Sequence, residues 1–381
     1  MAGAIVLFSG GLDSLLAVRA LQEQEIQVTG LNIVTPFQDG SDEARQRAES
    51  MKIELVTRSL GNEYLTMLEH PRWGVGKGVN PCIDCRIAML CEAKKLMEER
   101  GADFVATGEI VGQRPNSQMM HQLNLITRES GLGKKLVRPL SAKVLPATEP
   151  EETGLLDREK LLACTGRGRT GLIALARRRF QISSIPQPST GCLLSEKSFA
   201  PRVRDLLAHK PNPTAWDARL LKIGRHFRIN DQTKAVVARR QADCDALKTL
   251  FADPAKSRSA LFVPENFNGP ALLLVKEGKL GNLGDAVDSN TVSESGNMDA
   301  SDNADPFDDS LRAIAGGLIL RFDKPAKRAH LTGMPTVHYF TRPDRCDEIP
   351  IAPNAEADSL SMILPKEEKA KNCPPTENKV E

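Results

Sequence analysis

One short loop decides the fold of this chain: Ser9-Gly10-Gly11-Leu12-Asp13-Ser14. It follows the apolar run 4–8, which is typical of a buried strand, and precedes the run 15–21, whose apolar residues recur at helical spacing. The loop therefore connects a strand to a helix. Its glycines allow a tight bend close to a ligand, and the N–H groups of the helix start favour an anion. The two serines add hydroxyl donors, and Asp13 offers a carboxylate to Mg²⁺.

The loop differs from two common phosphate-binding motifs. It has no GxGxxG pattern, and no Gly-Lys-Ser/Thr follows it as in a Walker A loop. At every position it resembles the PP-loop of the ATP pyrophosphatases, which cleave ATP between the α- and β-phosphates and activate a substrate oxygen as an adenylate. The resemblance implies an ATP-binding set with a catalytic Asp13: Ser9, Gly10, Gly11, Asp13 and Ser14. The alternative is an ordinary glycine-rich turn of an α/β fold.

Composition places broad limits on the chain. Its 381 residues suffice for two domains, and 40% hydrophobic with 26% charged residues is typical of globular protein. The net charge of +2 neither indicates nor excludes a nucleic-acid partner. No apolar run is long enough to span a bilayer, and no signal peptide precedes the loop. Eight cysteines without a secretion signal indicate a reducing compartment, so we expect a cytoplasmic protein without membrane contact.

Strands and helices alternate along the first half of the chain. Strands are expected at 26–34, 53–57 and 103–107, with helices between them. This alternation predicts a parallel sheet with helices on both faces, and ligands bind beyond the strand carboxyl ends. The expected fold is therefore a Rossmann-like doubly wound sheet over residues 1–210, of the adenine nucleotide alpha hydrolase type by resemblance. The same resemblance assigns Gly108 to the nucleotide site.

A second candidate site involves cysteines. Cys82 and Cys85 form a CxxC at a predicted helix start, a setting that favours thiolates and lets both sulfurs face one metal. Cys192 follows a small-residue turn far along the chain, and no spacing rule joins it to the pair. The remaining helical cysteines are expected to be buried apolar residues: Cys91, Cys164 and Cys244. A structural CxxC is the alternative for the pair.

The cysteines, with the runs 80–86, 107–115 and 138–143, resemble those of tRNA thiouridine synthases, in particular stand-alone bacterial 4-thiouridine-synthase-like and 2-thiouridylate-enzyme-like proteins. This resemblance covers about residues 4–210. It implies an ATP-dependent tRNA sulfurtransferase that adenylates a uridine carbonyl oxygen and replaces it with sulfur. It further implies that three cysteines ligate a [4Fe–4S] cluster, with Cys82 and Cys192 also catalytic: Cys82, Cys85 and Cys192.

Several alternatives stay open. Zinc, or no metal and a persulfide pair, could replace the cluster. The loop would also serve a 7-deazaguanine or amide-forming adenylating enzyme, and a non-catalytic RNA-binding protein could keep the fold. Expected partners are tRNA and a sulfur donor, either sulfide or a cysteine desulfurase persulfide, and the sequence leaves a homodimer open. Arg114 and Arg138 could contact ATP phosphates or form ion pairs.

The chain departs from the best-known 4-thiouridine synthases because a loop at residue 9 leaves no room for a preceding RNA-binding THUMP module. We therefore expect the tRNA contacts elsewhere. Residues 165–180 hold five arginines and no acid, which suits phosphates, although a solvated helix face would look the same.

The second half is expected to form a small α+β domain over residues 215–345, which loosely resembles the RNA-associated NFACT-R domain. The run 316–322 is predicted to be a strand. Residues 285–309 carry eight acids and no base, so we expect a disordered insertion there. Residues 346–381 are expected to form a disordered tail.

Overall fold

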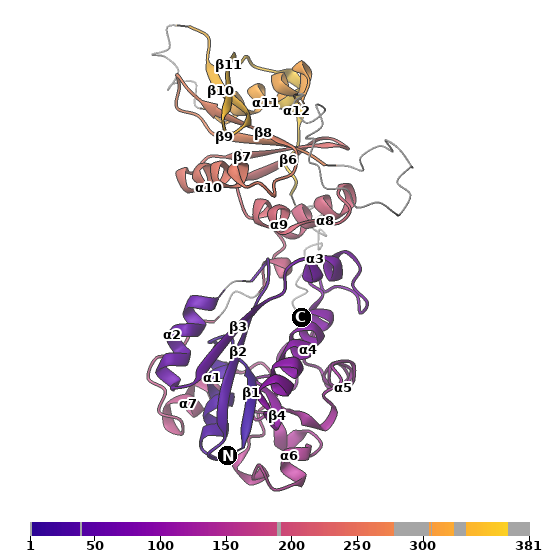
Figure 1. Cartoon of the computed structure of the whole chain (residues 1–381), viewed down its shortest axis with the longest axis vertical. Coiled ribbons are helices and arrows are strands. Elements are labelled where there is room, and N and C mark those ends of the chain that lie inside the picture. Colours follow the sequence, from indigo (N-terminus) through magenta and orange to yellow (C-terminus); the bar gives the residue numbers. More distant parts are fainter. Residues whose placement is uncertain are drawn as a thin grey trace, which may run out of the picture. The chain divides into compact units, whose positions relative to one another are not determined.

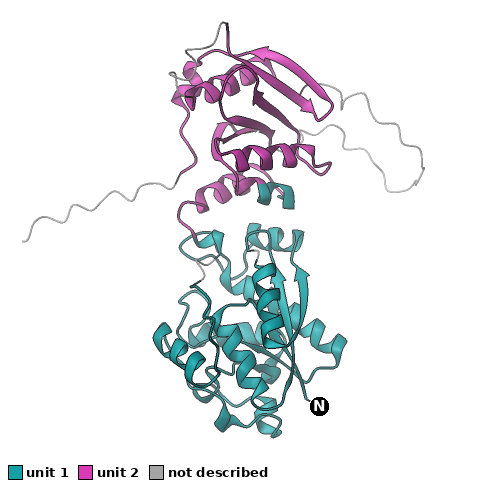
Figure 2. Ribbon diagram, turned by 90° about the vertical axis from the view of Figure 1, so that its left-hand side faces the viewer, with its two compact units in different colours: residues 1–195, 212–219 teal, residues 196–211, 220–381 magenta. Residues whose placement is uncertain are grey.

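A computed structural model describes residues 2–38, 40–188, 192–277, 305, 307–323 and 333–364. The chain divides into two compact units (Figure 2). Unit 1 comprises Met1–Ser195 and Asn212–Arg219, and unit 2 comprises Glu196–Pro211 and Leu220–Glu381. The division therefore comes earlier in the chain than the expected boundary near residue 210, because residues 196–211 pack with the second unit.

Unit 1 is built on a five-stranded sheet in the order β3-β2-β1-β4-β5, and every neighbouring pair is parallel. The strands are β1 (Gly3–Leu7), β2 (Gln27–Val34), β3 (Glu54–Ser59), β4 (Phe104–Thr107) and β5 (Leu136–Val137). All four residues of β4 and the last four of β1 are buried, as expected of continuous apolar strands in a parallel sheet. The predicted doubly wound α/β fold is confirmed.

Helices cover both faces of this sheet (Figure 1). They are α1 (Leu12–Gln22), α2 (Ser41–Met51), α3 (Asn62–Glu69), α4 (Cys82–Arg100), α5 (Met120–Glu129), α6 (Glu149–Glu152) and α7 (Arg169–Arg178). Short 3-10 helices lie at Gly133–Lys135, Ala142–Val144, Arg158–Lys160 and Leu193–Ser195. Successive residues of β1 point to opposite faces. Val6 accordingly packs with α1 and α2, and Ile5 packs with α4 and α5.

The central strand β1 lies between β2, which follows it directly, and β4, which is reached by a crossover. Ligands of such sheets bind at this switch, beyond the carboxyl ends of the strands. Leu7, the last residue of β1, pairs in register with Thr107, the last residue of β4. The loops 8–11 and 108–119 therefore start side by side, and the glycine-rich loop lies at the expected edge.

Unit 2 contains a six-stranded antiparallel sheet in the order β11-β10-β8-β9-β7-β6. Its strands are β6 (Arg225–Asn230), β7 (Thr233–Ala238), β8 (Ser259–Pro264), β9 (Ala271–Lys276), β10 (Thr336–Arg342) and β11 (Arg345–Pro350). The helices from residue 200 onward are α8 (Ala200–His209), α9 (Ala215–Leu221), α10 (Gln241–Ala252), α11 (Asp309–Arg321) and α12 (Ala355–Ser359). Leu318 of α11 packs in one core with Phe262 and Tyr339 of the sheet. The expected small α+β domain is thus confirmed as a fold.

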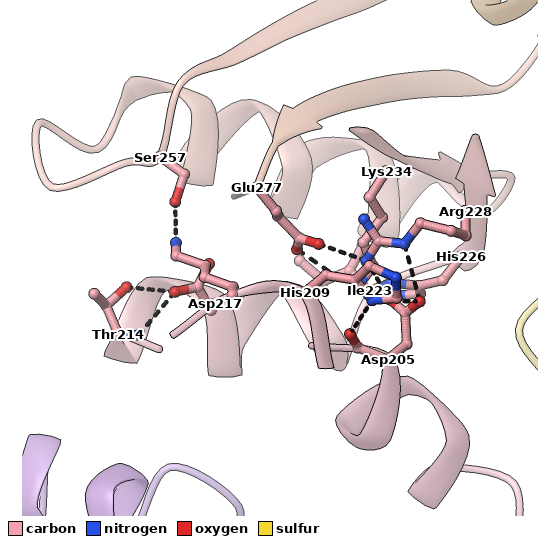
Figure 3. Close-up of polar contacts among 11 residues, drawn as sticks. Asp205, His209, Thr214, Asp217, Ile223, His226, Arg228, Lys234, Ser257 and Glu277 are labelled. Carbon is pink, nitrogen blue, oxygen red and sulfur yellow. Dashed lines mark hydrogen bonds and ion pairs between the residues drawn. The ribbon is translucent and has the colours of Figure 1, made fainter. Parts of the chain in front are cut away.

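Charged side chains form a buried network in unit 2 (Figure 3). The carboxylate of Asp205 on α8 lies 2.6 Å from Arg228 Nη2 on β6 and 3.2 Å from Lys234 Nζ on β7. Arg228 also donates to Glu277, just after β9, at 2.5 Å. Burial raises the pKa of Asp205, but its bond to Arg228 and the charge of Lys234 outweigh burial and lower that pKa. These contacts fix α8 to the sheet, which explains where unit 2 begins.

Two expectations for the second half are wrong in part. The run 316–322 lies mostly in helix α11, and not in a strand. A Cβ at Gly316 would come within 2.7 Å of Ile351, so this small residue allows close packing against the segment before α12. The tail expected from residue 346 is ordered at first, because β11 pairs with β10 and α12 follows. Residues 365–381 lie outside the described residues.

Most of the expected acidic insertion, 285–309, also lies outside the described residues. Of its described part, Asp305 accepts a hydrogen bond of 2.6 Å from the hydroxyl of Tyr339, and Asp308 caps the start of α11. These acids therefore belong to the fold of unit 2. Within the described ranges, no helix is both long enough and apolar enough to cross a membrane.

Candidate active site

The glycine-rich loop turns sharply from β1 into α1. Gly10 has φ +71°, a conformation that favours glycine, and a Cβ there would approach Ala44 to 3.1 Å. Gly11 is the N-cap of α1, and no side chain caps this helix start. The first-turn N–H groups of a helix lack intrahelical partners. They therefore remain available to an anion at the strand ends, as the sequence predicted.

The loop after β4 touches this helix start directly. A Cβ at Gly108 would lie 2.5 Å from the carbonyl carbon of Asp13 and 2.8 Å from the nitrogen of Ser14. Those contacts are with backbone atoms, which cannot move aside like a flexible side chain. Only glycine fits at position 108, so the residue assigned to the nucleotide site by resemblance lies against the glycine-rich loop.

Asp13 points toward polar groups from later parts of the chain. Gln113 Nε2 donates a hydrogen bond of 3.1 Å to its carboxylate. Burial raises the pKa of Asp13, while the bond to Gln113 and the charges of Arg114 and Arg169 act in the opposite direction. Burial also raises the pKa of Cys164, and the charge of Asp13 adds to this effect. A partly buried carboxylate beside two arginines suits a site for Mg²⁺ and phosphates.

A buried ion network joins the end of β4 to the start of α4. The Glu109 carboxylate accepts a hydrogen bond of 2.9 Å from Arg138 Nε and lies 3.1 Å from Arg86 Nε. Thr107 Oγ1 donates to the same carboxylate at 3.2 Å. Burial raises the pKa of Glu109, but the charges of Arg138 and Arg86 outweigh burial and lower it. Arg138 therefore forms ion pairs, which was one of its two predicted roles.

The cysteine pair occupies the first turn of α4. Asn80 Nδ2 donates to Cys82 Sγ at 2.9 Å, and the Cys85 amide donates to the carbonyl of Pro81 at 2.9 Å. The segment before the pair is tied to the one that carries Cys192, because Val79 N–H donates to the Leu194 carbonyl at 3.0 Å. Residues more than a hundred positions apart are thereby brought together.

Tyr64 of α3 identifies the cluster. Its hydroxyl hydrogen-bonds Cys85, and the charges of Cys85, Cys192 and Cys82 all act on it. Burial and these thiols raise the pKa of Tyr64, so its hydroxyl stays protonated and donates. Burial likewise raises the pKa of Cys85, against the charge of Arg86 and the bond from Tyr64. The three predicted cysteines thus share one neighbour.

A pocket of about 260 Å³ lies beside the cysteines. Its walls come from α3, the segment that follows it, α4 and the end of α5; they include Tyr64, Trp73, Asp84, Ile87 and Glu129. Arg72 lies 4.8 Å from the centre of the Trp73 ring and pairs with Glu129 at 3.1 Å. The pocket is therefore partly aromatic, with charged groups at its wall.

Known proteins give an independent view. No protein-family model matches the chain. The tRNA-specific 2-thiouridylase MnmA of Psychromonas ingrahamii is 26% identical over 198 residues, which is 46% of this chain and 54% of that protein. The probable tRNA sulfurtransferase of Methanosarcina acetivorans is 31% identical over 117 residues, 29% of this chain and 28% of that protein. Its relatives are tRNA thiouridylases and tRNA sulfurtransferases.

These tRNA thiouridylase relatives confirm the resemblance to the tRNA thiouridine synthases. The chain spans about half the length of the first thiouridylases it matches. A solved structure titled 4-thiouridine synthetase in complex with RNA and bound ATP matches 36% of both chains, with 25% identity and a TM-score of 0.31. A predicted tRNA methyltransferase subunit of Methanocaldococcus jannaschii covers 46% of this chain and 74% of its own, with 16% identity and a TM-score of 0.27.

Sequence reasoning missed several residues that shape the site. Gln113 and Arg86 lay inside runs quoted for the resemblance but received no role. Tyr64 gave no signal, since nothing in a short amphipathic helix indicates which residue will meet distant cysteines. Glu109 could have been found, because a carboxylate and Arg138 each follow an apolar strand and such charges must pair when buried.

Proposed function

We propose that this protein is an ATP-dependent tRNA sulfurtransferase that converts a uridine to a thiouridine. The observation that carries the proposal is the junction of two sites in unit 1. Gly108 packs against the glycine-rich loop at Asp13, while its neighbour Glu109 pairs with Arg86, the residue after Cys85. A nucleotide site and a thiol site thus adjoin the same short turn. The tRNA thiouridylase and sulfurtransferase relatives favour the same function.

The reaction has two steps. The uridine carbonyl oxygen attacks the α-phosphorus of ATP, and pyrophosphate leaves. Sulfide then attacks the same ring carbon, and AMP departs with the former carbonyl oxygen. The backbone N–H groups of the loop would stabilise the charge on the phosphates, together with the hydroxyls of Ser9 and Ser14. Gly10, Gly11 and Gly108 would allow the close approach.

Asp13 would hold Mg²⁺, and its carboxylate fits this role because one oxygen is oriented by Gln113 beside two arginines. The ion would neutralise charge on the pyrophosphate leaving group. The chain itself orients the carboxylate and excludes part of the solvent. Gln113 therefore acts through Asp13.

The thiols Cys82, Cys85 and Cys192 would hold the [4Fe–4S] cluster, which would carry the sulfur atom for transfer. Thiolates are the usual ligands of such clusters, and the three thiols share Tyr64 as a neighbour. Within the described ranges, no three His, Cys, Asp or Glu residues are arranged to hold a single metal ion. This supports a multi-iron group over one zinc ion.

Exposed arginines are candidates for the tRNA contact. Arg167, Arg177 and Arg178 are exposed, whereas Arg179 pairs with Glu23 at 2.7 Å. Only the first three are free of that surface pair and suited to phosphates. Unit 2 could add an RNA-binding surface, in keeping with its loose resemblance to NFACT-R. A homodimer and the identity of the sulfur donor remain predictions.

The first experiment is anaerobic purification with iron and labile sulfide assays. Wild type, Cys85→Ala and the matched control Cys91→Ala, in the same helix, are compared. We expect about four irons per chain, lost only in Cys85→Ala. Zinc without iron would contradict the cluster and favour the 7-deazaguanine or amide-forming alternative. A metal-free protein would instead favour a persulfide pair, Cys82 and Cys192.

The second experiment measures AMP and thiouridine after incubation with ATP, Mg²⁺, sulfide and unmodified tRNA. Gly108→Ala should abolish both products, because the new Cβ meets backbone atoms at 2.5 Å. Gly171→Ala is the control, since nothing lies within 4 Å of its Cβ. AMP without thiouridine in the wild type would contradict sulfur transfer, and neither product would favour a non-catalytic RNA-binding protein.

A further inference from the structure

Tyr64 stands between the thiols and the pocket. Its side chain is only 3% exposed, and its ring contacts that of Phe37, with centroids 6.1 Å apart. The same residue lines the pocket of about 260 Å³. The ring is therefore held by packing, which leaves its hydroxyl in a defined place among the cysteines.

The helix α4 presents two different faces to this region. Asp84, Ile87 and Ala88, spaced at three and four residues, line the pocket. Cys85 lies on the adjoining face and accepts the hydrogen bond of Tyr64. Tyr64 thus forms the partition between an apolar pocket and the candidate sulfur site.

The two cysteines of the first turn have different hydrogen-bond donors. Cys82 receives the side-chain amide of Asn80, which comes from its own loop. Cys85 receives the hydroxyl of Tyr64, which comes from a separate helix. Arg86, the neighbour of Cys85, is engaged by Glu109. The position of the Cys85 sulfur therefore depends on a residue outside the CxxC segment.

We propose that Tyr64 is a positioning residue for sulfur transfer, whose hydroxyl holds the Cys85 sulfur in place between Cys82 and Cys192. This inference rests on the proposed function for its consequence, but the contact itself does not. Groups that hydrogen-bond to metal-ligating residues fix ligand orientation, and their loss typically costs about 10- to 100-fold in metal affinity or activity.

The chain offers a matched control because it contains only two tyrosines. Tyr339 of unit 2 is also buried, at 1% exposure, and its hydroxyl also hydrogen-bonds, to Asp305 at 2.6 Å. Tyrosine labelled with ¹³C at the hydroxyl-bearing ring carbon should give two resonances. In the metal-free protein, Cys85→Ala should shift the Tyr64 resonance and leave that of Tyr339 in place. An unmoved Tyr64 resonance would contradict the contact.

The role is tested with Tyr64→Phe and Tyr339→Phe, which remove one oxygen each and keep both rings. Tyr64→Phe should lower the rate of thiouridine formation about 10-fold or more, with pyrophosphate exchange and the KM for ATP unchanged. Tyr339→Phe should match the wild type. Equal rates in all three proteins, or an equal loss of exchange, would overturn the role. A wild type that forms no thiouridine would refute the proposed function, whereas the resonance would still report the contact.

Discussion

Each unit buries a network of charges, and the two networks differ in what they touch. In unit 1, Glu109 pairs with Arg86 and Arg138; in unit 2, Asp205 and Glu277 pair with cations of the sheet. Both networks hold a carboxylate whose pKa is lowered. Only the first adjoins candidate site residues, through Gly108 and Cys85. Buried charge alone is therefore a poor functional signal, and its neighbours decide what it means.

The largest effect is expected from Glu109→Gln. Removal of one partner from a buried ion pair typically costs about 3–5 kcal/mol, and here two arginines lose their counter-charge. Hydrogen exchange of β4 and α4 peptides should reveal this loss, together with reduced thiouridine formation. Glu152→Gln is the control, because Glu152 pairs with Lys134 at the surface. Equal protection in both variants would show that the buried network does not stabilise unit 1.

A smaller effect is expected from Glu277→Gln in unit 2. Asp205 still neutralises both Arg228 and Lys234, so we expect a loss of about 1–3 kcal/mol. Hydrogen exchange should rise in β9 and α8, while AMP formation stays at the wild-type rate. A drop in AMP formation as large as that of Glu109→Gln would break the comparison between the two networks.

The two units should also differ in their response to acid. Burial, with the charges of Lys234 and Arg202, holds the pKa of His226 well below its ordinary 6.5, so the folded chain keeps it neutral. Below that pH the unfolded chain binds a proton that the folded chain does not, and unit 2 loses stability as the pH falls, by up to about 1.4 kcal/mol per pH unit.

The contribution of Glu109 to unit 1 should persist to lower pH. Its folded pKa lies below the ordinary 4.5, so its stabilisation is complete above that value and is lost only as the pH falls through the folded pKa. Hydrogen exchange at pH 7.5 and 5.5 compares the units after correction for the intrinsic exchange rates. His226→Gln should remove the difference, and a slope that survives this substitution would assign the effect to other groups.

The smallest effect is expected where opposite charges meet at the surface. Arg179 and Glu23 lie 2.7 Å apart with side chains 34% and 36% exposed. Water and salt screen such pairs, so Arg179→Gln should cost less than about 1 kcal/mol in urea unfolding. A larger loss would indicate that its bond to the Lys160 carbonyl, and not the charge pair, holds α7 in place.

The nucleotide half of the site followed from the sequence because its signals are local. The loop Ser9–Ser14 lies between a strand and a helix, and the sheet rule fixes the edge to which both belong. The strands and helices predicted up to residue 107 all occur, with ends that shift by a few residues.

The thiol half depends on contacts that no local pattern encodes. Cys192 reaches the CxxC through a bond between Val79 and Leu194, and Tyr64 arrives from a third segment. The run 316–322 failed for a related reason, since a short apolar run fits a strand or a buried helix equally well. Its glycines were needed for packing against α12, which lies later in the chain.

Trp73 gives this protein a built-in optical reporter. The chain has two tryptophans; Trp216 is 1% exposed, whereas Trp73 lines the pocket beside Tyr64 with Arg72 against its ring. Indole emission depends on the surroundings of the ring. Occupation of the pocket, or loading of the nearby thiols with a light-absorbing group, should therefore change the emission of Trp73 while Trp216 supplies a constant background, so the two halves of the proposed reaction can be followed in real time without an added dye.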